Sequence, residues 1–524
     1  MRLYSAFATV GGLSMVSRVL GFLRDILIAA VLGTGMIADA FVVAFRMPNL
    51  FRRLFAEGAF NAAFVPLFAK RLEADGNGSA HAFAEEALAG LFAVLLLVTA
   101  IAQIAMPWLV LGLAPGFATE PEKLDLATAL TRIAFPYLMC MSLVALLSGL
   151  LNSLHRYMAA AAAPIVLNAV LVAVMLIAHW RGYHNDPAAG YLLVWGVFAA
   201  GILQLAMLWI AAKRAGFALR LRLPRMTEGV RRLLALGIPG LIAGGITQIN
   251  IVVGTIIASL EASAVSYLYY ADRLYQLPLG IVGVAIGVVL LPDLSRHLGA
   301  GNHTAAMDSQ NRSMELALLL TLPAAVALLV AAEPIIRVLF ERGAFTHDDT
   351  QATAWALAAF AIGLPAFVLI KVLQPGFFAH EDTKTPMRYA GVNLVLNAAG
   401  SIILFFGFKT AGFMPHVGIA LATSIAAWVN AVMLWGTLKH RGHFIIDNRL
   451  ARNVPLIALA SVLMGAGVIV AGIVLDPWMR TGAGLMVQAS GLAALVTFGV
   501  VLFATVILAT GVMTPAQLKR KVRR

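Results

Sequence analysis

Arginine and carboxylate side chains interrupt the apolar sequence at a few places, where they could bind a charged group. They are Arg18, Arg24 and Asp25 in the first apolar segment, Asp39, Arg46, Arg52, Arg53 and Glu57 in the second, and Asp272 and Arg273 further along the chain. The planar guanidinium group binds phosphate or carboxylate through two parallel hydrogen bonds. Because every basic residue in these segments is arginine, the pattern favours recognition of an anionic group.

The spacing in the second segment places several of these side chains on one face of a helix. At about 100° per residue, Asp39, Arg46, Arg53 and Glu57 fall within about 20° of one stripe. Arg52 points roughly 120° away from that stripe. Their positions around the predicted helix therefore favour Arg46 and Arg53 over Arg52 as residues that line a common site.

Two interpretations of these charges remain open. Opposite signs, as in Arg18 with Asp25 and Asp39 with Arg46, allow ion pairs that hold helices together. A charged side chain facing lipid at mid-membrane costs on the order of 2.5–3.5 kcal/mol, so residues without such partners must face a water-filled cavity. Basic residues outnumber acidic ones in these segments, which favours a positively charged cavity for an anionic cargo.

The elements that carry these residues are predicted to be membrane-spanning helices. Of 524 residues, 61% are hydrophobic and only 12% are charged, and the mean hydropathy is +0.89. A soluble domain has roughly a quarter charged residues. Apolar runs of about 20 residues, enough to cross a bilayer, recur from end to end and do not alternate as barrel strands would. The sequence predicts an all-α polytopic membrane protein with about fourteen transmembrane helices.

The distribution of Lys and Arg among the loops predicts the orientation. Basic residues crowd into alternate loops, above all into 213–232 and 519–524. The loops on the other side hold few: Lys123, Arg181, Arg337, Arg342, Lys409 and Arg480. The positive-inside rule therefore predicts that both termini face the cytoplasm. The net charge of +13 reflects this topology and attraction to lipid headgroups, so no nucleic-acid partner is expected.

The basic segment 220–225 has two interpretations. Its alternation of arginine and leucine would allow it to lie in the membrane interface. A solvated positive loop that joins two halves of the chain is the favoured interpretation.

An internal duplication organises the chain. Landmarks recur in order at an offset of about 227 residues. The pairs are Pro66 with Pro292, Pro107 with Pro334, Gly116 with Gly343, Pro136 with Pro365, and Asn168 with Asn397. The repeated unit holds six spans, an even number, so the two copies are expected to lie parallel in the membrane. Two parallel lobes are typical of transporters, although a scaffold that moves nothing is the alternative.

The predicted parts of the chain follow from this duplication. They are an N-terminal six-helix lobe at 1–215, a basic cytoplasmic linker at 216–233, a C-terminal six-helix lobe at 234–440, two extra helices at 441–513 and a basic cytoplasmic tail at 514–524.

Signatures of catalysis and of cofactor or metal binding are not found in the sequence. It has no Walker loop, no His-Glu-x-x-His and no nucleophile elbow, and no pair of carboxylates has an evident acid–base role. The single cysteine, Cys140, is expected to be a small buried hydrophobic residue. We therefore expect no catalytic residue, no cofactor and no metal, and a transporter rather than an enzyme.

Five segments resemble one family, the MurJ/MviN lipid II flippases. They are 17–25 (SRVLGFLRD), 38–60 (ADAFVVAFRMPNLFRRLFAEGAF), 270–278 (YADRLYQLP), 340–345 (FERGAF) and 376–386 (GFFAHEDTKTP). The resemblance covers essentially the whole chain. It implies the multidrug/oligosaccharidyl-lipid/polysaccharide exporter superfamily, with two six-helix lobes and with helices 13 and 14 forming a groove for a polyprenyl tail.

The resemblance also implies a function. The cargo would be lipid II, the undecaprenyl-pyrophosphate-linked peptidoglycan precursor, flipped from the cytoplasmic to the periplasmic leaflet of a bacterial inner membrane by alternating access. The implied partners are lipid II and the phospholipid bilayer, with cell-wall synthesis proteins as further candidates. By matching positions, the resemblance makes Arg18, Arg24, Arg52 and Arg273 essential cavity arginines and Asp25, Asp39 and Glu57 functional carboxylates, and the face argument adds Arg46 and Arg53.

This chain departs from the family at positions that bear on how transport is coupled to an ion. Some members have a glutamate where this chain has Gln276. Some members bind sodium through a carboxylate on helix 7, where this chain offers only Gln248 and Asn250, so no sodium site is expected. Coupling to the membrane potential or to an ion is left open. The rival functions are a cation-coupled multidrug antiporter, which predicts an acidic cavity, a polyprenyl-pyrophosphate enzyme, and a cell-wall assembly scaffold.

Overall fold

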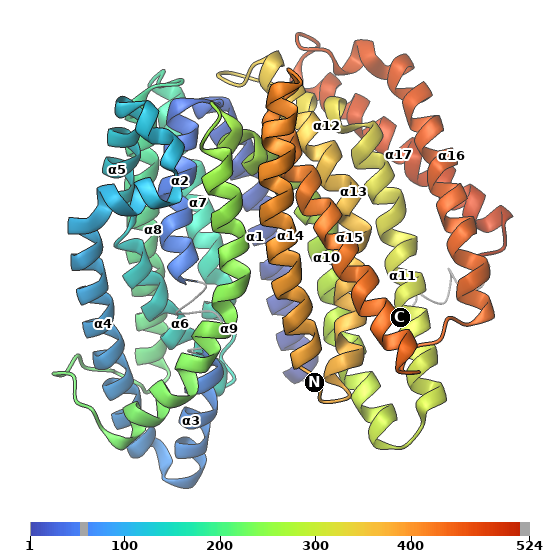
Figure 1. The fold of residues 1–524 in the computed structure, drawn as a ribbon. Helices are drawn as coiled ribbons and strands as arrows, with labels where there is room; N and C mark the ends of the chain where they lie inside the picture. Colours follow the sequence, from blue (N-terminus) through green and yellow to red (C-terminus); the bar gives the residue numbers. More distant parts are fainter. Residues whose placement is uncertain (1, 53–60, 514–524) are drawn as a thin grey trace. The chain divides into compact units, whose positions relative to one another are not determined.

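Long apolar runs in lipid must satisfy their own backbone hydrogen bonds, and this chain does so by forming helices. The computed structural model describes residues 2–52 and 61–513, which form helices α1–α17 and the short 3-10 helix η2 (Figure 1). Ten helical stretches in these residues are long and apolar enough to cross a membrane. The predicted all-α polytopic class is confirmed, and about fourteen spans are consistent with it.

Four predicted spans are not among these ten stretches. They fall on α1 (Arg2–Leu32), α2 (Met36–Arg52), α9 (Glu228–Ala258) and α10 (Ala264–Gly299). Three of them, α1, α2 and α10, carry the arginines singled out from the sequence. Charged side chains are costly against lipid, so these three helices are expected to turn their charged faces toward protein or water.

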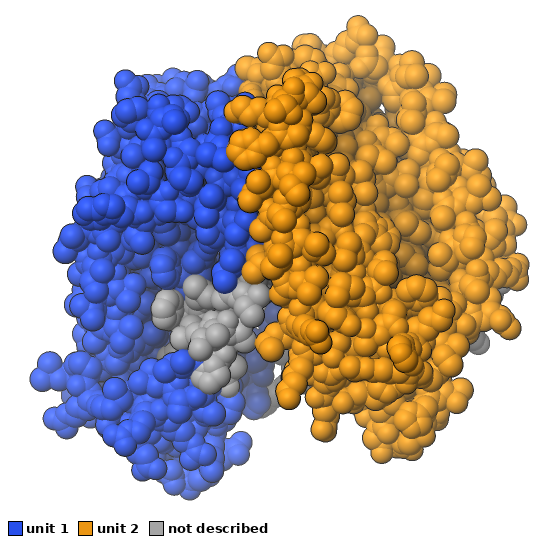
Figure 2. Space-filling view, in the orientation of Figure 1, with its two compact units in different colours: residues 1–266, 342–345 blue, residues 267–341, 346–524 orange. Residues whose placement is uncertain are grey.

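The chain packs as two compact units, coloured separately in Figure 2. Unit 1 comprises Met1–Ser266 with Arg342–Phe345, and unit 2 comprises Tyr267–Glu341 with Thr346–Arg524. Unit 1 continues from α2 with α3 (Asn61–Ala74), α4 (Gly76–Leu113), η2 (Pro115–Thr119), α5 (Pro121–Ala134), α6 (Tyr137–Ser153), α7 (Met158–Trp180) and α8 (Pro187–Arg214) before α9. Within it α1 packs along α7, α2 along α5, and α6 along α8.

Aromatic side chains fill one end of the core of unit 1. The Phe64 ring stacks on Phe68 and on Phe83, with ring centroids 5.6 Å apart in both cases, and Phe217 closes the cluster against Phe68. Cys140 is also buried in this unit, as expected from the sequence.

Unit 2 is built around α13. It contains most of α10, then α11 (His303–Val330), α12 (Ala332–Phe340), α13 (His347–Phe378), α14 (Lys384–Thr410), α15 (Pro415–His440), α16 (Asn448–Met479) and α17 (Leu485–Ala509). The helix α13 packs on α11 and α15, while α14 packs on α15 and α16 packs on α11 and α17. Both helices predicted as additions to the repeat, α16 and α17, therefore belong to this unit.

The compact units and the predicted lobes rest on different criteria. Helix α9, which the duplication assigns to the second lobe, packs on α3 and α4 of unit 1. The order of packing nevertheless repeats, because α7 packs on α8 as α14 packs on α15. The predicted lobe boundaries remain predictions, and the tail at 514–524 lies outside the described residues.

The basic linker between α8 and α9 lies against α4. Glu85 on α4 accepts a hydrogen bond from the backbone N–H of Arg220 at 2.9 Å and pairs with the Arg222 guanidinium at 2.6 Å. The Thr227 hydroxyl donates to Glu86, also on α4, at 2.7 Å. The linker is thus an extended segment held to unit 1 by two carboxylates, and its arginine side chains are exposed.

The turn at 342–345 packs against the end of α1, and this contact requires glycine at position 343. Gly343 has φ +60°, and a Cβ at this position would lie 2.2 Å from the carbonyl oxygen of Ala30. The backbone N–H of Ala344 donates to that same oxygen at 2.9 Å. Across the contact, a Cβ at Gly33 would lie 2.4 Å from the oxygen of Ala344. Two glycines therefore permit the backbones to touch.

We predict that Gly343→Ala destabilises the protein more than a glycine replacement at the same φ elsewhere. Gly301 is a matched control, with φ +69° and open space around its Cβ position. Gly301→Ala should cost about 1 kcal/mol for backbone strain, whereas Gly343→Ala adds a steric clash of roughly 1–3 kcal/mol. Melting temperatures of the purified variants in detergent measure the difference. Equal melting temperatures would contradict the close contact between Gly343 and the carbonyl oxygen of Ala30.

Two loops of unit 2 are joined by an ion pair at the ends of their helices. Asp382, in the turn between α13 and α14, pairs with Arg441 at 2.6 Å and accepts a hydrogen bond from the Thr385 hydroxyl at 2.6 Å. The hydrogen bonds from Arg441 and Thr385 hold the pKa of Asp382 well below its ordinary value. Nearby, the rings of His380 and His443 stack with centroids 3.8 Å apart.

This ion pair should survive moderate acid. A lowered pKa means that folding favours the charged carboxylate, so the contact is complete above the ordinary aspartate pKa of about 4 and is lost only as the pH falls below it. Hydrogen–deuterium exchange of the turn at 379–383, corrected for the intrinsic rate, measures this. Asp382→Asn should expose the turn at neutral pH. Loss of wild-type protection already near about pH 5 would be inconsistent with the lowered pKa.

Candidate functional site

The first arginine site joins α1 to α7. Arg24 donates from Nε and Nη2 to Oδ1 of Asp25, at 3.0 and 2.7 Å, and from Nη1 to Oδ1 of Asn168 at 2.9 Å. Asn168 donates back to the carbonyl oxygen of Ser17 at 2.9 Å. The helices approach closely because position 21 is glycine, where a Cβ would lie 3.3 Å from the Asn168 amide. The guanidinium of Arg24 is therefore held in one orientation.

The aspartate on α2 is enclosed by protein and paired with a lysine. The Lys123 ammonium lies 2.9 Å from Asp39, and both side chains are almost fully buried. Asp39 also accepts from the backbone N–H and the hydroxyl of Ser266, at 2.9 and 2.8 Å, and from the N–H of Ser263 at 3.1 Å. Ser263 directly precedes α10 and Ser266 lies in its first turn, where the helix dipole favours a negative charge. Asp39 therefore fastens α5 and the start of α10 to α2.

The arginines on α2 lie beside polar oxygen atoms. Arg46 donates to the Thr255 hydroxyl of α9 at 2.6 Å, and Arg52 donates to the side-chain oxygen of Asn49 at 3.2 Å. Both side chains are half-buried. Arg46 therefore contacts α9, whereas Asp39 contacts α5 and the start of α10. Arg53 and Glu57 lie outside the described residues.

Two predicted site residues lie apart from these contacts. Arg18 on α1 is exposed, whereas Asp25, predicted to share its face, is buried with Arg24. Arg273 belongs to unit 2, where its guanidinium carbon lies 4.6 Å from the centroid of the Tyr269 ring. Beside it on α10, Asp272 accepts a hydrogen bond from Gln276. Unit 1 thus gathers Arg18, Arg24, Asp25, Asp39, Arg46 and Arg52, and unit 2 holds Arg273.

The structure adds two polar partners that the sequence analysis did not select. Lys123 had been assigned to a loop, but it lies in the first turn of α5 and is buried against Asp39. Asn168 had been noted only as a landmark of the duplication, and it holds Arg24. A polar residue retained at a duplicated position inside an apolar run was the available signal for Asn168. No comparable signal marked Lys123.

The described residues contain no group of three or more His, Cys, Asp and Glu side chains that could hold a metal ion. What they do contain is a set of arginines fixed by carboxylate, amide and hydroxyl oxygens on helices that border apolar segments. Such guanidinium groups are suited to binding an anion through charge-assisted hydrogen bonds.

Comparisons with known proteins show the family of this chain. The family model described as lipid II flippase MurJ matches residues 28–487. The chain is similar to a probable lipid II flippase MurJ of Rhizobium tropici, with 49% identity over 525 residues, covering 100% of this chain and 97% of the relative.

Solved structures show the same fold. A lipid II flippase MurJ in an inward closed conformation matches with a TM-score of 0.75 and 24% identity, over 98% of this chain and 99% of that one. An inward-facing multidrug resistance transporter of the MATE family matches with a TM-score of 0.66 and 15% identity, over 82% of this chain and 98% of that one. By the extent of the family match and the identity to its relatives, the chain belongs to the lipid II flippase MurJ family.

Proposed function

We propose that this protein flips lipid II across the membrane, from the cytoplasmic to the periplasmic leaflet. Membership of the lipid II flippase MurJ family over residues 28–487 is the observation that carries this proposal. Its multi-pass helical fold is suited to a cargo that is lipid at one end and a charged headgroup at the other. The protein is then a transporter, with both termini in the cytoplasm, and the positive-inside distribution of Lys and Arg supports that orientation.

In this proposal, arginines of α1, α2 and α10 bind the pyrophosphate and headgroup of the cargo. A pyrophosphate carries several negative oxygens, and each guanidinium can bind two of them in its own plane. Arg18 is exposed and would contact the headgroup directly. Arg24 is oriented by Asp25 and Asn168, so little rotamer entropy is lost when it binds. Because Lys123 pairs with Asp39, that carboxylate does not offset the charge of an arginine.

The proposed cycle is alternating access. The arginine site opens to the cytoplasmic side, admits the headgroup while the polyprenyl tail stays in lipid, and then opens to the periplasmic side. After release the empty site carries net positive charge, which a membrane potential negative inside draws back toward the cytoplasm. That potential contributes about 2.3 kcal/mol per charge per 100 mV. The excess of arginine over carboxylate in α1, α2 and α10 supports this direction of return.

We predict that Arg24→Ala and Arg273→Ala each lower lipid II flipping by about tenfold or more while the protein still inserts. The reason is that a hydrogen bond to a charged group contributes about 1.5–3 kcal/mol. The measurement is accessibility of the lipid II headgroup to an external probe in cells that depend on the variant. Arg181→Ala, an exposed arginine that follows α7, is the matched control and should flip normally. Full flipping by both site variants would contradict the proposed arginine site.

We also predict that Asp39 and Lys123 act as a pair. Removing one partner leaves the other charged in an apolar interior, so Asp39→Asn and Lys123→Met should each lower the free energy of unfolding by roughly 3–5 kcal/mol. The double variant should recover most of that loss, because neither charge then remains buried alone. Melting temperatures in detergent, with flipping assays beside them, measure the recovery. A double variant no more stable than either single one would show that the two residues are not coupled.

A further inference from the structure

An apolar groove opens on unit 2 between α13, α15 and α16, with α11 at its base. Its volume is about 360 Å³. The side chains that line it include Leu318 of α11, Leu373 of α13, Trp428 and Trp435 of α15, and Val454 of α16. This groove is separate from the arginine sites, and it is not the apolar cleft between α16 and α17. Nothing in the proposed flipping cycle uses it.

One stripe of α15 runs along the groove and ends in a lysine. Trp428, Val432 and Trp435 line the groove, and their spacing of three and four residues places them on one face of the helix. Lys439, four residues further, continues that face. Its ammonium group is exposed and lies 5.3 Å from the centroid of the Trp435 ring. The apolar groove therefore has a cation at its mouth.

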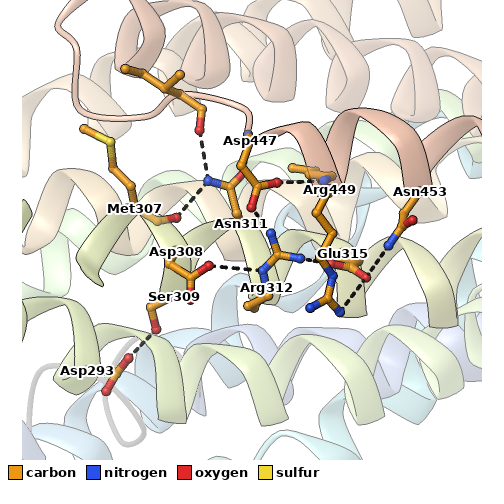
Figure 3. A network of polar contacts seen from close by, with 12 residues as sticks. Asp293, Met307, Asp308, Ser309, Asn311, Arg312, Glu315, Asp447, Arg449 and Asn453 are labelled. Atoms are coloured by element: carbon orange, nitrogen blue, oxygen red, sulfur yellow. Dashed lines mark hydrogen bonds and ion pairs between the residues drawn. The ribbon is translucent and has the colours of Figure 1, made fainter. Parts of the chain in front are cut away.

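The opposite wall of the groove is fixed by the polar network in Figure 3. Glu315 of α11 is almost fully buried and accepts hydrogen bonds from Asn453 at 2.8 Å and Arg449 at 3.1 Å, both on α16. Arg312, one turn before Glu315 on α11, pairs with both Glu315 and Asp447. These contacts join the first turns of α16 to α11.

The same network fixes the loop that leads into α16. Asp447 caps the helix by accepting from the backbone N–H of Leu450 at 2.7 Å, and Asn311 donates to the carbonyl oxygen of Ile445 at 2.9 Å. Ile446, Leu450 and Val454 then line the groove. The groove is therefore preformed, and a ligand would not need to order it on binding.

The chemistry of the groove selects a lipid of one leaflet. The positive-inside distribution predicts that the loop at 439–452 faces the cytoplasm, and the cytoplasmic leaflet is rich in anionic headgroups. Tryptophan at the level of the headgroups is typical of membrane-facing surfaces. A partner helix would fit poorly, because a helix about 10 Å wide that rises about 5.4 Å per turn would fill this volume with roughly one turn. An extended acyl chain fits the elongated apolar lining.

We propose that this groove binds one anionic phospholipid of the cytoplasmic leaflet. An acyl chain lies along Trp428, Trp435 and Val454, and the phosphate is held by Lys439. The groove is a binding site for a bilayer lipid, and this lipid is distinct from the cargo. The proposal does not depend on whether the protein flips lipid II.

Quenching of tryptophan fluorescence by brominated lipid tests this site. The full-length protein is reconstituted in phosphatidylcholine vesicles that contain a small fixed fraction of either phosphatidylglycerol or phosphatidylcholine brominated on its acyl chains. Brominated phosphatidylglycerol should quench more than brominated phosphatidylcholine, because the site selects it. Trp435→Phe and Trp428→Phe each remove one of the two tryptophans that line the groove and should each lower that excess, while Trp195→Phe, an exposed tryptophan on α8 of unit 1, should leave it unchanged.

Two pairs of variants separate the groove from general surface effects. Lys439→Gln should lower the preference for the anionic lipid about fivefold, the effect of one lysine near an anionic membrane surface. Its control is Lys409→Gln, another lysine beside an aromatic ring, 5.9 Å from Phe405 at the end of α14. Ala451→Phe fills the groove from α16 and should also abolish the excess quenching, whereas Leu459→Phe on an exposed part of the same helix should not.

Two results would overturn the proposal. Equal quenching by the two brominated lipids in the wild-type protein would mean that ordinary bilayer lipid fills the groove without selection. An equal loss of preference in Lys409→Gln and Lys439→Gln would mean that surface charge in general, and not the mouth of this groove, attracts the anionic lipid. Melting temperatures of all variants in detergent show which of them are folded, and the comparison is made among those.

Discussion

A charge carried into an apolar environment must find its partner inside the protein, and the Asp39–Lys123 pair shows how much of the fold follows from this constraint. Asp39 lies on α2, Lys123 on α5, and Ser266 on α10, so one buried carboxylate brings three separate elements of the chain together. Arg24 does the same for α1 and α7 through Asn168. In each case polar contacts hold the helices together. Removing one partner of such a contact would leave the other buried and charged.

The sequence predicted the parts of the structure that depend on local pattern. Apolar length gave the helices, because the backbone has no alternative in lipid. Helical periodicity placed Asp39 and Arg46 on a common face, and in the structure Arg46 contacts α9 while Asp39 contacts α5 and the start of α10. The lone Cys140 was expected to be buried, and it is. These properties depend on short stretches of sequence and on the solvent around them.

What the sequence could not predict is which distant residue completes each site. Lys123 is 84 positions from Asp39, and its place near the start of a helix made it look like a loop residue. The opposite signs of Asp39 and Arg46 allowed an ion pair between them, whereas in the structure Asp39 forms an ion pair with Lys123. Pairing between helices depends on their packing order, and periodicity within one helix carries no information about that order. Asn168 stood out in the sequence only as a landmark of the predicted repeat, and nothing there linked it to Arg24.

The predicted repeat pairs Asn168 with Asn397, and these two amides make different contacts in the structure. Asn168 on α7 accepts a hydrogen bond from Arg24 at 2.9 Å, and Asn397 on α14 accepts one from Ser401 of its own helix at 3.5 Å. An amide can do either, since it both donates and accepts. The same residue type can therefore hold a charged side chain in one helix and a hydroxyl group in the other. Six of the seven described residues predicted to bind the cargo lie in unit 1, on α1 and α2, so these two helices carry most of the proposed cargo contacts and α10 adds Arg273.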